Sequence, residues 1–167
     1  MLESLSESTE PIIILDREGR EYRMKVAGDE DKYFIIKLLY RNSEVGRLQC
    51  VLNPPGKLMI GDIIIRNDII HTPPHLWARL WGRLVKPKPI DYRQRGLGTH
   101  LLQFAIAKAR QRGFKRIYGS LTQEDINNNP NLVKWYKKHG FQILPPSAEN
   151  IETAVCGISM DLEQKSS

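Results

Sequence analysis

Residues 93–98 read Arg-Gln-Arg-Gly-Leu-Gly, and a stretch with helical periodicity follows them directly. One face of that stretch carries apolar residues at helical spacing, namely Leu101, Leu102, Ala105 and Ala109. Gly113 stands just past the last turn, so we predict a helix over 98–112. A helix N-terminus exposes unpaired N–H groups with partial positive charge, and glycines let an anion approach the backbone. The sequence therefore predicts an anion-binding loop flanked by Arg93 and Arg95.

Two glycines before a helix are a weak signal by themselves, and a tight turn with an incidental glycine pair is the alternative. Two other phosphate-binding loops do not fit. The chain has no Gly-x-x-x-x-Gly-Lys-Ser/Thr run, which a P-loop requires. A dinucleotide fingerprint requires a third glycine where this chain has Leu101, and an acidic residue that 115–121 does not contain.

The rest of the chain predicts an α+β fold with a mostly antiparallel sheet. Apolar or alternating runs predict strands at 11–16, 21–26, 32–41, 45–52, 57–68, 114–121, 141–144 and 155–162. Short turns separate the first five, which predicts an antiparallel meander. Asn129 and Pro130 suit the N-cap and first position of a second helix, which ends at Gly140. This order differs from the regular alternation of a doubly wound fold.

For domain organisation, we expect a flexible N-terminal tail over 1–10 and a single domain over 11–163. Within it, segment 69–90 interrupts the strand pattern and is predicted as an insertion with a short helix between proline-bounded loops. The 167 residues, 41% of them hydrophobic and 26% charged, suit one globular domain.

Composition also narrows the partners. No apolar run reaches the roughly 18 residues of a membrane span. The start lacks the features of a secretory signal, and Cys50 and Cys156 make no disulfide framework, so we expect a cytoplasmic protein. The four histidines lack metal-ligand spacing, so we expect no metal. The net charge of +6 suits nucleic acid, phospholipid or a phosphorylated cofactor, and the basic residues gather around the glycine loop.

Two motifs together resemble the signatures of the GNAT superfamily of N-acetyltransferases. Residues 93–98 resemble its (Gln/Arg)-x-x-Gly-x-(Gly/Ala) signature. Residues 129–141 are similar to its second signature, an asparagine followed by an aromatic-tyrosine pair and then Gly-Phe. The resemblance covers 57–141. It implies the acyl-CoA N-acyltransferase fold, a mixed sheet with splayed central strands flanked by helices. It also implies transfer of an acetyl group from acetyl-CoA to an amine by direct attack in a ternary complex.

The resemblance further implies roles for individual residues. Coenzyme A would bind at the loop, the helix start and one asparagine: Arg93, Gln94, Arg95, Gly96, Leu97, Gly98, Thr99 and Asn129. Tyr136 would protonate the leaving thiolate, because a phenol with a pKa near 10 is matched to a thiol. A backbone N–H on a splayed strand would stabilise the oxyanion. Asp62 is the first candidate for the general base.

Alternatives stay open for these roles. Tyr136 also has the spacing of a core aromatic, and Asp62 of a solvent-facing strand residue. His71, His75, Asp68 or a water chain could serve as the base instead. Because the family's loop usually follows its strand almost at once, the segment 69–90 leaves open whether 62–66 or 84–90 lines the pantetheine arm. That segment could wall the acceptor site, form a homodimer contact or simply pack as an extra piece.

Two other functions compete with catalysis. The first is a non-catalytic acyl-CoA-binding regulatory module with the same fold. The second, which we expect less, is a basic nucleic-acid-binding domain. The chain contains no helix-turn-helix, RRM or zinc-finger signature in its support. The acceptor amine, whether a small molecule or a peptide or protein, is not encoded in any motif that we can read.

Overall fold

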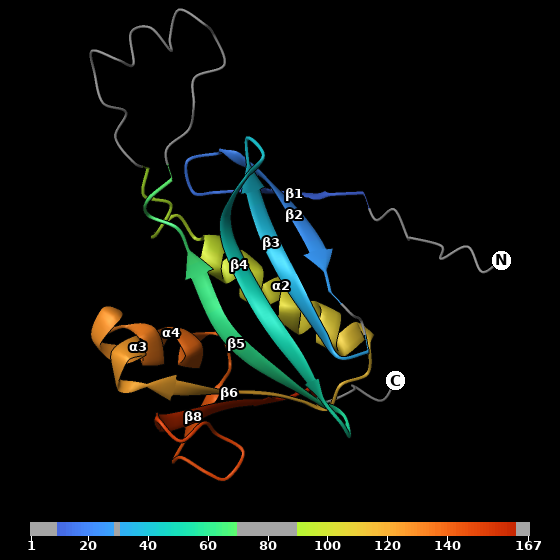
Figure 1. Cartoon of the computed structure of the whole chain (residues 1–167), viewed down its shortest axis with the longest axis vertical. Helices are drawn as coiled ribbons and strands as arrows, with labels where there is room; N and C mark the ends of the chain where they lie inside the picture. Colours follow the sequence, from blue (N-terminus) through green and yellow to red (C-terminus); the bar gives the residue numbers. More distant parts are fainter. Residues whose placement is uncertain (1–9, 29–30, 70–89, 163–167) are drawn as a thin grey trace, which may run out of the picture.

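The computed structural model describes residues 10–28, 31–69 and 90–162, and in this part the chain forms one eight-stranded sheet (Figure 1). The strands are β1 (Ile12–Leu15), β2 (Glu21–Ala27), β3 (Tyr33–Tyr40), β4 (Ser43–Asn53), β5 (Lys57–Ile65), β6 (Arg116–Thr122), β7 (Gln142–Leu144) and β8 (Ala154–Asp161). The helices are α2 (Leu97–Gln111), α3 (Gln123–Asn128) and α4 (Leu132–Lys138). No described helix is long and apolar enough to cross a membrane.

The sheet is mixed and mostly antiparallel, which confirms the predicted α+β class. Strands β1 to β5 form the predicted meander, β5 pairs parallel with β6, and β8 lies antiparallel between β6 and β7. Alternate residues of β3, namely Phe34, Ile36 and Leu38, are fully buried in the core that also includes α2. The alternation of the sequence thus corresponds to one buried and one more exposed face of the meander.

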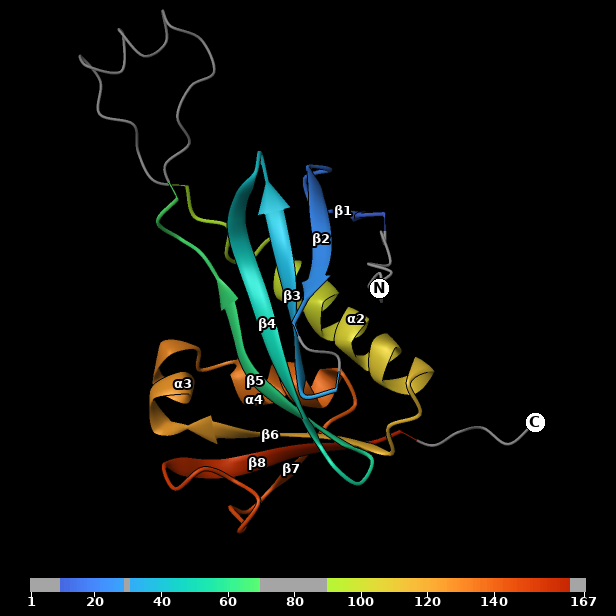
Figure 2. The ribbon, with the colours of Figure 1, turned by 45° about the vertical axis from the view of Figure 1, so that its right-hand side comes forward.

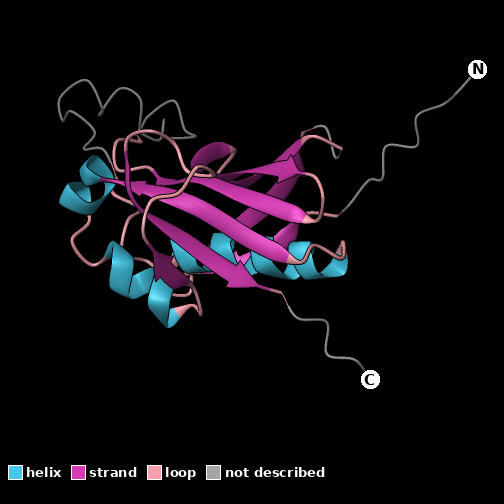
Figure 3. Cartoon of the chain, turned by 90° about the horizontal axis from the view of Figure 1, so that it is seen from below, coloured by secondary structure: helices cyan, strands magenta, loops and turns pink. Residues whose placement is uncertain are grey.

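Helix α2 is the predicted helix, shifted by one residue. Figure 2 shows it lying across one face of the sheet, and Figure 3 shows the same layer from below. Its apolar face is buried as expected, with Leu101, Leu102, Ala105 and Ala109 inaccessible to solvent. Each buried leucine contributes about 1.5–3 kcal/mol of transfer free energy. Gly113 follows the helix with φ 76°, the left-handed conformation that ends many helices.

The two central strands diverge, as the predicted fold requires. The parallel register of β5 with β6 runs from Lys57 opposite Arg116 to Ile60 opposite Gly119 and then stops. Both strands continue past this point, and Figure 1 shows them separating. Beyond Ile60, the backbone groups of β5 that face β6 therefore have no strand partner. The divergence begins beside a β-bulge, where Gln49 of β4 faces both Gly61 and Asp62.

Some element boundaries were predicted wrongly. Helix α4 begins at Leu132 with Asn131 at its N-cap, so the helix does not start at Asn129 and Pro130. Asn129 instead ends α3, a short helix that the sequence pattern did not predict. Strand β5 ends at Ile65 rather than at residue 68. All but the last residue of the predicted tail over 1–10, and the short helix predicted within the segment 69–90, lie outside the described residues.

The two ends of the predicted insertion lie side by side. Ile69 and Ile90 form an isolated antiparallel bridge, in which the Ile90 N–H donates to the Ile69 carbonyl at 2.8 Å. The Tyr92 N–H donates to the Arg66 carbonyl at 2.9 Å. The glycine loop is therefore held next to the end of β5. Strand β5, with residues 62–65, is the strand that diverges from β6, whereas residues 84–89 are not described.

Candidate functional site

The loop before α2 presents a row of unpaired backbone N–H groups. In the described part of the chain, no hydrogen bond reaches the N–H groups of residues 94–99, and the first to pair is that of His100, with the Gly96 carbonyl at 3.3 Å. Helix α2 also lacks a side-chain cap and an acidic residue in its first turn. Gln94 and Gly96 are both left-handed, with φ 60° and 83°. Backbone of this kind forms a concave, positively polarised anion site.

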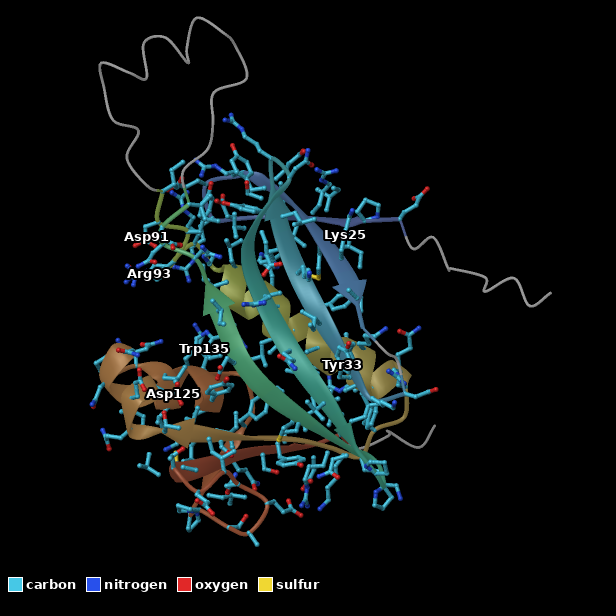
Figure 4. All side chains as sticks on the ribbon, in the orientation of Figure 1. Lys25, Tyr33, Asp91, Arg93, Asp125 and Trp135 are labelled. Carbon is cyan, nitrogen blue, oxygen red and sulfur yellow. The ribbon has the colours of Figure 1, made fainter. Side chains whose placement is uncertain are left out.

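The two flanking arginines are both occupied by carboxylates. The Arg93 Nε and Nη2 atoms donate to Asp91 at 2.9 and 2.7 Å, and Figure 4 shows this pair next to the end of β5. These hydrogen bonds lower the pKa of Asp91 to about 2. Arg95 donates to Glu18 at 2.7 Å and lies 3.5 Å from Asp16. Both arginines therefore tie the loop to neighbouring carboxylates.

Asp16, in the β1–β2 turn, anchors that turn to the loop. Its carboxylate is almost fully buried and accepts hydrogen bonds from the Glu18 N–H, the Arg20 N–H and the Tyr22 hydroxyl at 2.9, 2.9 and 2.8 Å. Burial alone would raise the pKa of Asp16, but these hydrogen bonds outweigh it and the pKa is lowered. The Arg17 N–H also donates to the Arg95 carbonyl at 3.3 Å. Sequence reasoning missed Asp16, although an aspartate three residues before a glycine is a turn signal.

Three elements meet at Gly98, at the start of α2. A Cβ atom built there would lie 3.9 Å from both Ile63 of β5 and Trp135 of α4. The Trp135 indole N–H donates to the Thr99 hydroxyl at 3.3 Å, and Figure 4 shows Trp135 on the side of β5 where α4 packs. The structure thus brings the two sequence motifs together beside the diverging strands. An alanine would fit at Gly98, whereas a large side chain would displace its neighbours.

Tyr136 lies in the same region and is nearly buried. It is 4% exposed, and its ring packs against Trp135 and Phe141 at 4.9 and 5.3 Å between centroids. Its hydroxyl forms no hydrogen bond with a described residue. Because no fully buried side-chain polar atom in the described part lacks a partner, the hydroxyl must reach the surface. Burial first, and then the charges of Asp125 and Asp62, raise the pKa of Tyr136 well above its usual value.

The two carboxylates near Tyr136 differ in what they bind. Asp125 accepts hydrogen bonds from the Thr122 N–H and hydroxyl, both at 2.7 Å, in a capping box that begins α3. Asp62 is exposed at the β-bulge and has no hydrogen bond or ion pair with any described residue. Asp62 is thus the less engaged of the two carboxylates. Sequence reasoning missed Asp125, although the Thr-x-x-Asp spacing is a helix-start signal.

The remaining candidates lie elsewhere or are engaged. Asn129 is exposed, and its side-chain oxygen accepts the Asn131 N–H at 3.2 Å between α3 and α4. Asp68 is paired with Arg66 through hydrogen bonds of 2.9 and 3.2 Å. His71 and His75 lie outside the described residues. Within the described ranges, no group of three histidine, cysteine or acidic residues could hold a metal ion.

Comparison with known proteins decides the family. A family model described as the acetyltransferase (GNAT) family matches residues 2–141. The chain belongs to this family. The two motifs at 93–98 and 129–141 therefore predicted the GNAT family correctly. A search of curated proteins found no match.

Solved GNAT structures share the fold at low sequence identity. An acetyltransferase of the GNAT family from Staphylococcus aureus is 13% identical, with a TM-score of 0.56 over 78% of this chain and 69% of that one. An acetyltransferase from Thermus thermophilus is 17% identical, with a TM-score of 0.52 over 78% and 65%. PaiA N-acetyltransferase from Thermoplasma acidophilum, solved with coenzyme A, is 9% identical, with a TM-score of 0.52 over 78% and 62%. These likenesses confirm the predicted GNAT fold.

Proposed function

We propose that this GNAT protein transfers an acetyl group from acetyl-CoA to an amine by direct attack in a ternary complex. The observation that carries the proposal is the position of the unpaired N–H groups of residues 94–99 at the end of β5, the strand that diverges from β6. A pyrophosphate on these groups would let the pantetheine arm run along the β5 edge. The PaiA relative, solved with coenzyme A, supports this choice of cosubstrate.

The backbone of β5 suits the acyl-transfer step. The amine attacks the thioester carbonyl, a C–N bond forms, the C–S bond breaks and the thiolate leaves with the electron pair. Negative charge develops on the carbonyl oxygen during this step, and a preorganised N–H donor would stabilise it. Beyond Ile60, β5 has backbone groups without a strand partner on the side facing β6. We assign the oxyanion donor to this stretch, beside the bulge at Gly61 and Asp62.

Tyr136 would act on the leaving thiolate and Asp62 on the amine. The raised pKa of Tyr136 keeps its phenol protonated at every working pH, so its hydroxyl can donate to the departing sulfur. Each pKa unit of mismatch adds about 1.4 kcal/mol to complete proton transfer. Tyr136 therefore contributes chiefly as a hydrogen-bond donor, with the proton moving late. Asp62 would accept the proton of the incoming ammonium group, directly or through water.

The same site could bind an acyl-CoA without turning it over. The observation that favours this second candidate is the packing of Tyr136 between Trp135 and Phe141, which gives the residue a structural role of its own. In such a regulatory module, replacement of the Tyr136 hydroxyl would leave cofactor binding and every cellular readout unchanged. The two candidates thus share a binding site and differ in what the phenol does.

Calorimetric titration with acetyl-CoA tests the binding site first. We expect the wild type and Gly98→Ala to bind, because a Cβ at residue 98 meets only ordinary contacts of 3.9 Å. We expect Gly98→Trp to lose binding, because a large side chain at residue 98 would displace Ile63 and Trp135 next to the N–H groups. If the wild type does not bind, the proposal fails. Equal binding by all three proteins would place the cofactor elsewhere.

An acetylation assay over a panel of amines then tests catalysis. We expect Tyr136→Phe to lower kcat by about 10²-fold or more with little change in acetyl-CoA affinity. Asp62→Asn should lower the rate most at pH values where the acceptor amine is protonated. A Tyr136→Phe enzyme as active as the wild type would remove the tyrosine from the chemistry. An absence of turnover with every amine, despite binding, would favour the regulatory module.

A further inference from the structure

A second group of basic residues surrounds a surface hollow at the start of β2 and the end of β3. The hollow has a volume of about 400 Å³, and its lining includes Arg20, Arg23 and Arg41 together with Tyr22, Tyr40 and Glu21. We call it the arginine hollow. It lies apart from residues 94–99, and none of its lining residues belongs to the two GNAT motifs.

Neutral groups hold the three guanidinium groups in place. Arg20 and Arg41 lie over the Tyr40 ring at 5.2 and 5.3 Å from its centroid. Arg23 donates a hydrogen bond to the Asn42 side-chain carbonyl. Within the described part of the chain, none of the three forms an ion pair with a carboxylate. The three guanidinium groups are thus held in place without a direct ion pair, and the Asp16 carboxylate attracts Arg20 from a longer distance.

Several other described arginines do form direct ion pairs. Five of them are paired with carboxylates at 2.7–3.5 Å, namely Arg47, Arg66, Arg93, Arg95 and Arg116. The lining of the hollow offers one acidic residue, Glu21, which pairs with none of the three arginines. Arg20, Arg23 and Arg41 therefore form a local concentration of positive charge in which no guanidinium group has a carboxylate in direct contact.

The backbone at Arg41 is also unusual. Tyr40 pairs with Ser43, so Arg41 and Asn42 form a two-residue hairpin turn, and both have left-handed φ angles of 47° and 65°. Asparagine and glycine favour these positions, whereas arginine there is strained. An unfavourable residue kept at such a position points to a use for its side chain. Here that side chain completes the hollow.

We propose that the arginine hollow binds the oxyanion group, phosphate or carboxylate, of a small molecule. Guanidinium groups bind such groups through paired, charge-assisted hydrogen bonds. A volume of about 400 Å³ suits one small ligand. The hollow also connects to the cofactor loop, because Tyr22 lines it and donates to Asp16, which lies 3.5 Å from Arg95. The oxyanion would belong to the acceptor or to an effector that acts through this contact.

Arg41→Asn provides a direct test. Asparagine favours the left-handed backbone, so the variant removes a guanidinium group without disturbing the hairpin. Arg47→Gln is the matched control, because Arg47 is exposed on β4 but lies outside the hollow and is paired with Glu44. The full-length protein would be titrated with inorganic phosphate and with succinate. The side-chain Nε–H signals of the arginines, followed by NMR, would report on each residue.

We expect saturable shifts at Arg20, Arg23 and Arg41, and an apparent affinity at least about tenfold lower in Arg41→Asn than in Arg47→Gln. Gly98→Trp should leave this response intact. Binding at the hollow can therefore be tested even if the protein does not bind acetyl-CoA. Equal affinity in the two arginine variants, or shifts confined to residues 94–99, would overturn the proposal. So would a response to a single-stranded oligonucleotide with a steep salt dependence and none to the small anions, which would indicate nucleic-acid binding.

The same variants separate the two sources of the oxyanion, and this step rests on the proposed acetyltransferase activity. For an oxyanion carried by the acceptor, Arg41→Asn should raise the KM of carboxylated or phosphorylated amines and leave that of an uncharged analogue unchanged. For an effector, added phosphate or succinate should change the acetyl-CoA affinity of the wild type but not that of Arg41→Asn. An Arg41→Asn enzyme that matches the wild type in both assays would refute a functional role for the hollow.

Discussion

Replacement of Asp16 by alanine should destabilise the protein more than the loss of any single exposed ion pair. Asp16→Ala removes three hydrogen bonds to a charged acceptor and leaves the buried Tyr22 hydroxyl without its partner. A hydrogen bond to a charged group contributes about 1.5–3 kcal/mol, but the two turn N–H groups can rebind water. We therefore expect a net loss of about 3 kcal/mol in the free energy of unfolding. In a chain of this length, that loss lowers Tm by roughly 6–12 °C.

Urea unfolding at pH 7 would measure this difference, with two controls. Asp16→Asn keeps an acceptor for both turn N–H groups and should lose only about 1 kcal/mol. Asp161→Ala breaks the exposed pair with Arg116 and should cost less than about 1 kcal/mol. If Asp16→Ala were no less stable than Asp161→Ala, the Asp16 carboxylate would not hold the turn, and our account of the loop anchor would be wrong.

The pH dependence gives the same reasoning a second test. The folded-state pKa of Asp16 lies below its usual value of 3.8. Its stabilising contribution is therefore complete above the unfolded pKa and is lost as pH falls through the folded one. The stability gap between wild type and Asp16→Ala should stay constant from about pH 5 to 8 and narrow below about pH 4. A gap that widened on acidification would contradict the sign of the shift.

Three further outcomes follow from particular contacts. Gly96→Ala should cost about 1–2 kcal/mol in urea unfolding, because φ is 83° while the added Cβ meets nothing closer than 3.5 Å; an unchanged midpoint would argue against the left-handed turn. Trp135→Phe keeps an aromatic side chain but loses the hydrogen bond to Thr99, so calorimetry should show acetyl-CoA binding weakened several-fold. Burial raises the pKa of Cys50 to about 12. Iodoacetamide at pH 8 should therefore label the less buried Cys156 first, and mass spectrometry would show the order.

The sequence predicted best those elements whose apolar pattern is long and regular. All eight strands and α2 were found. The buried residues of β2 and β3 recur with a period of two, and those of α2 recur at helical spacing. Helix α3 was missed because it has six residues and buries none of them, so no periodicity could reveal it. The start of α4 was misplaced because Asn129 and Asn131 are equally good caps. The end of α3 decides between them, and the sequence pattern did not reveal that helix.

The site could be predicted only where its residues lie close together in the sequence. The loop at 94–99 follows from its own glycines and the helix after it. The contact between Arg95 and Glu18 spans 77 residues, and no local pattern indicates such a pairing. The charge of Arg93 and Arg95 was expected to serve the anion, but both side chains proved to be engaged with carboxylates. The arginine hollow was not foreseen for the same reason, since its members come from separate strands and turns.

Because Ile69 and Ile90 form a bridge, the geometry of the site should not depend on how many residues lie between them. Because the two ends are already joined by backbone hydrogen bonds, residues inserted or removed between them do not change how β5 leads into residues 91–96. In general, the entropic cost of closing a flexible loop grows only slowly with its length, by about 0.6 kcal/mol for each doubling. This position is thus a natural graft point, where a segment from another protein could be exchanged without shifting the register of the sheet.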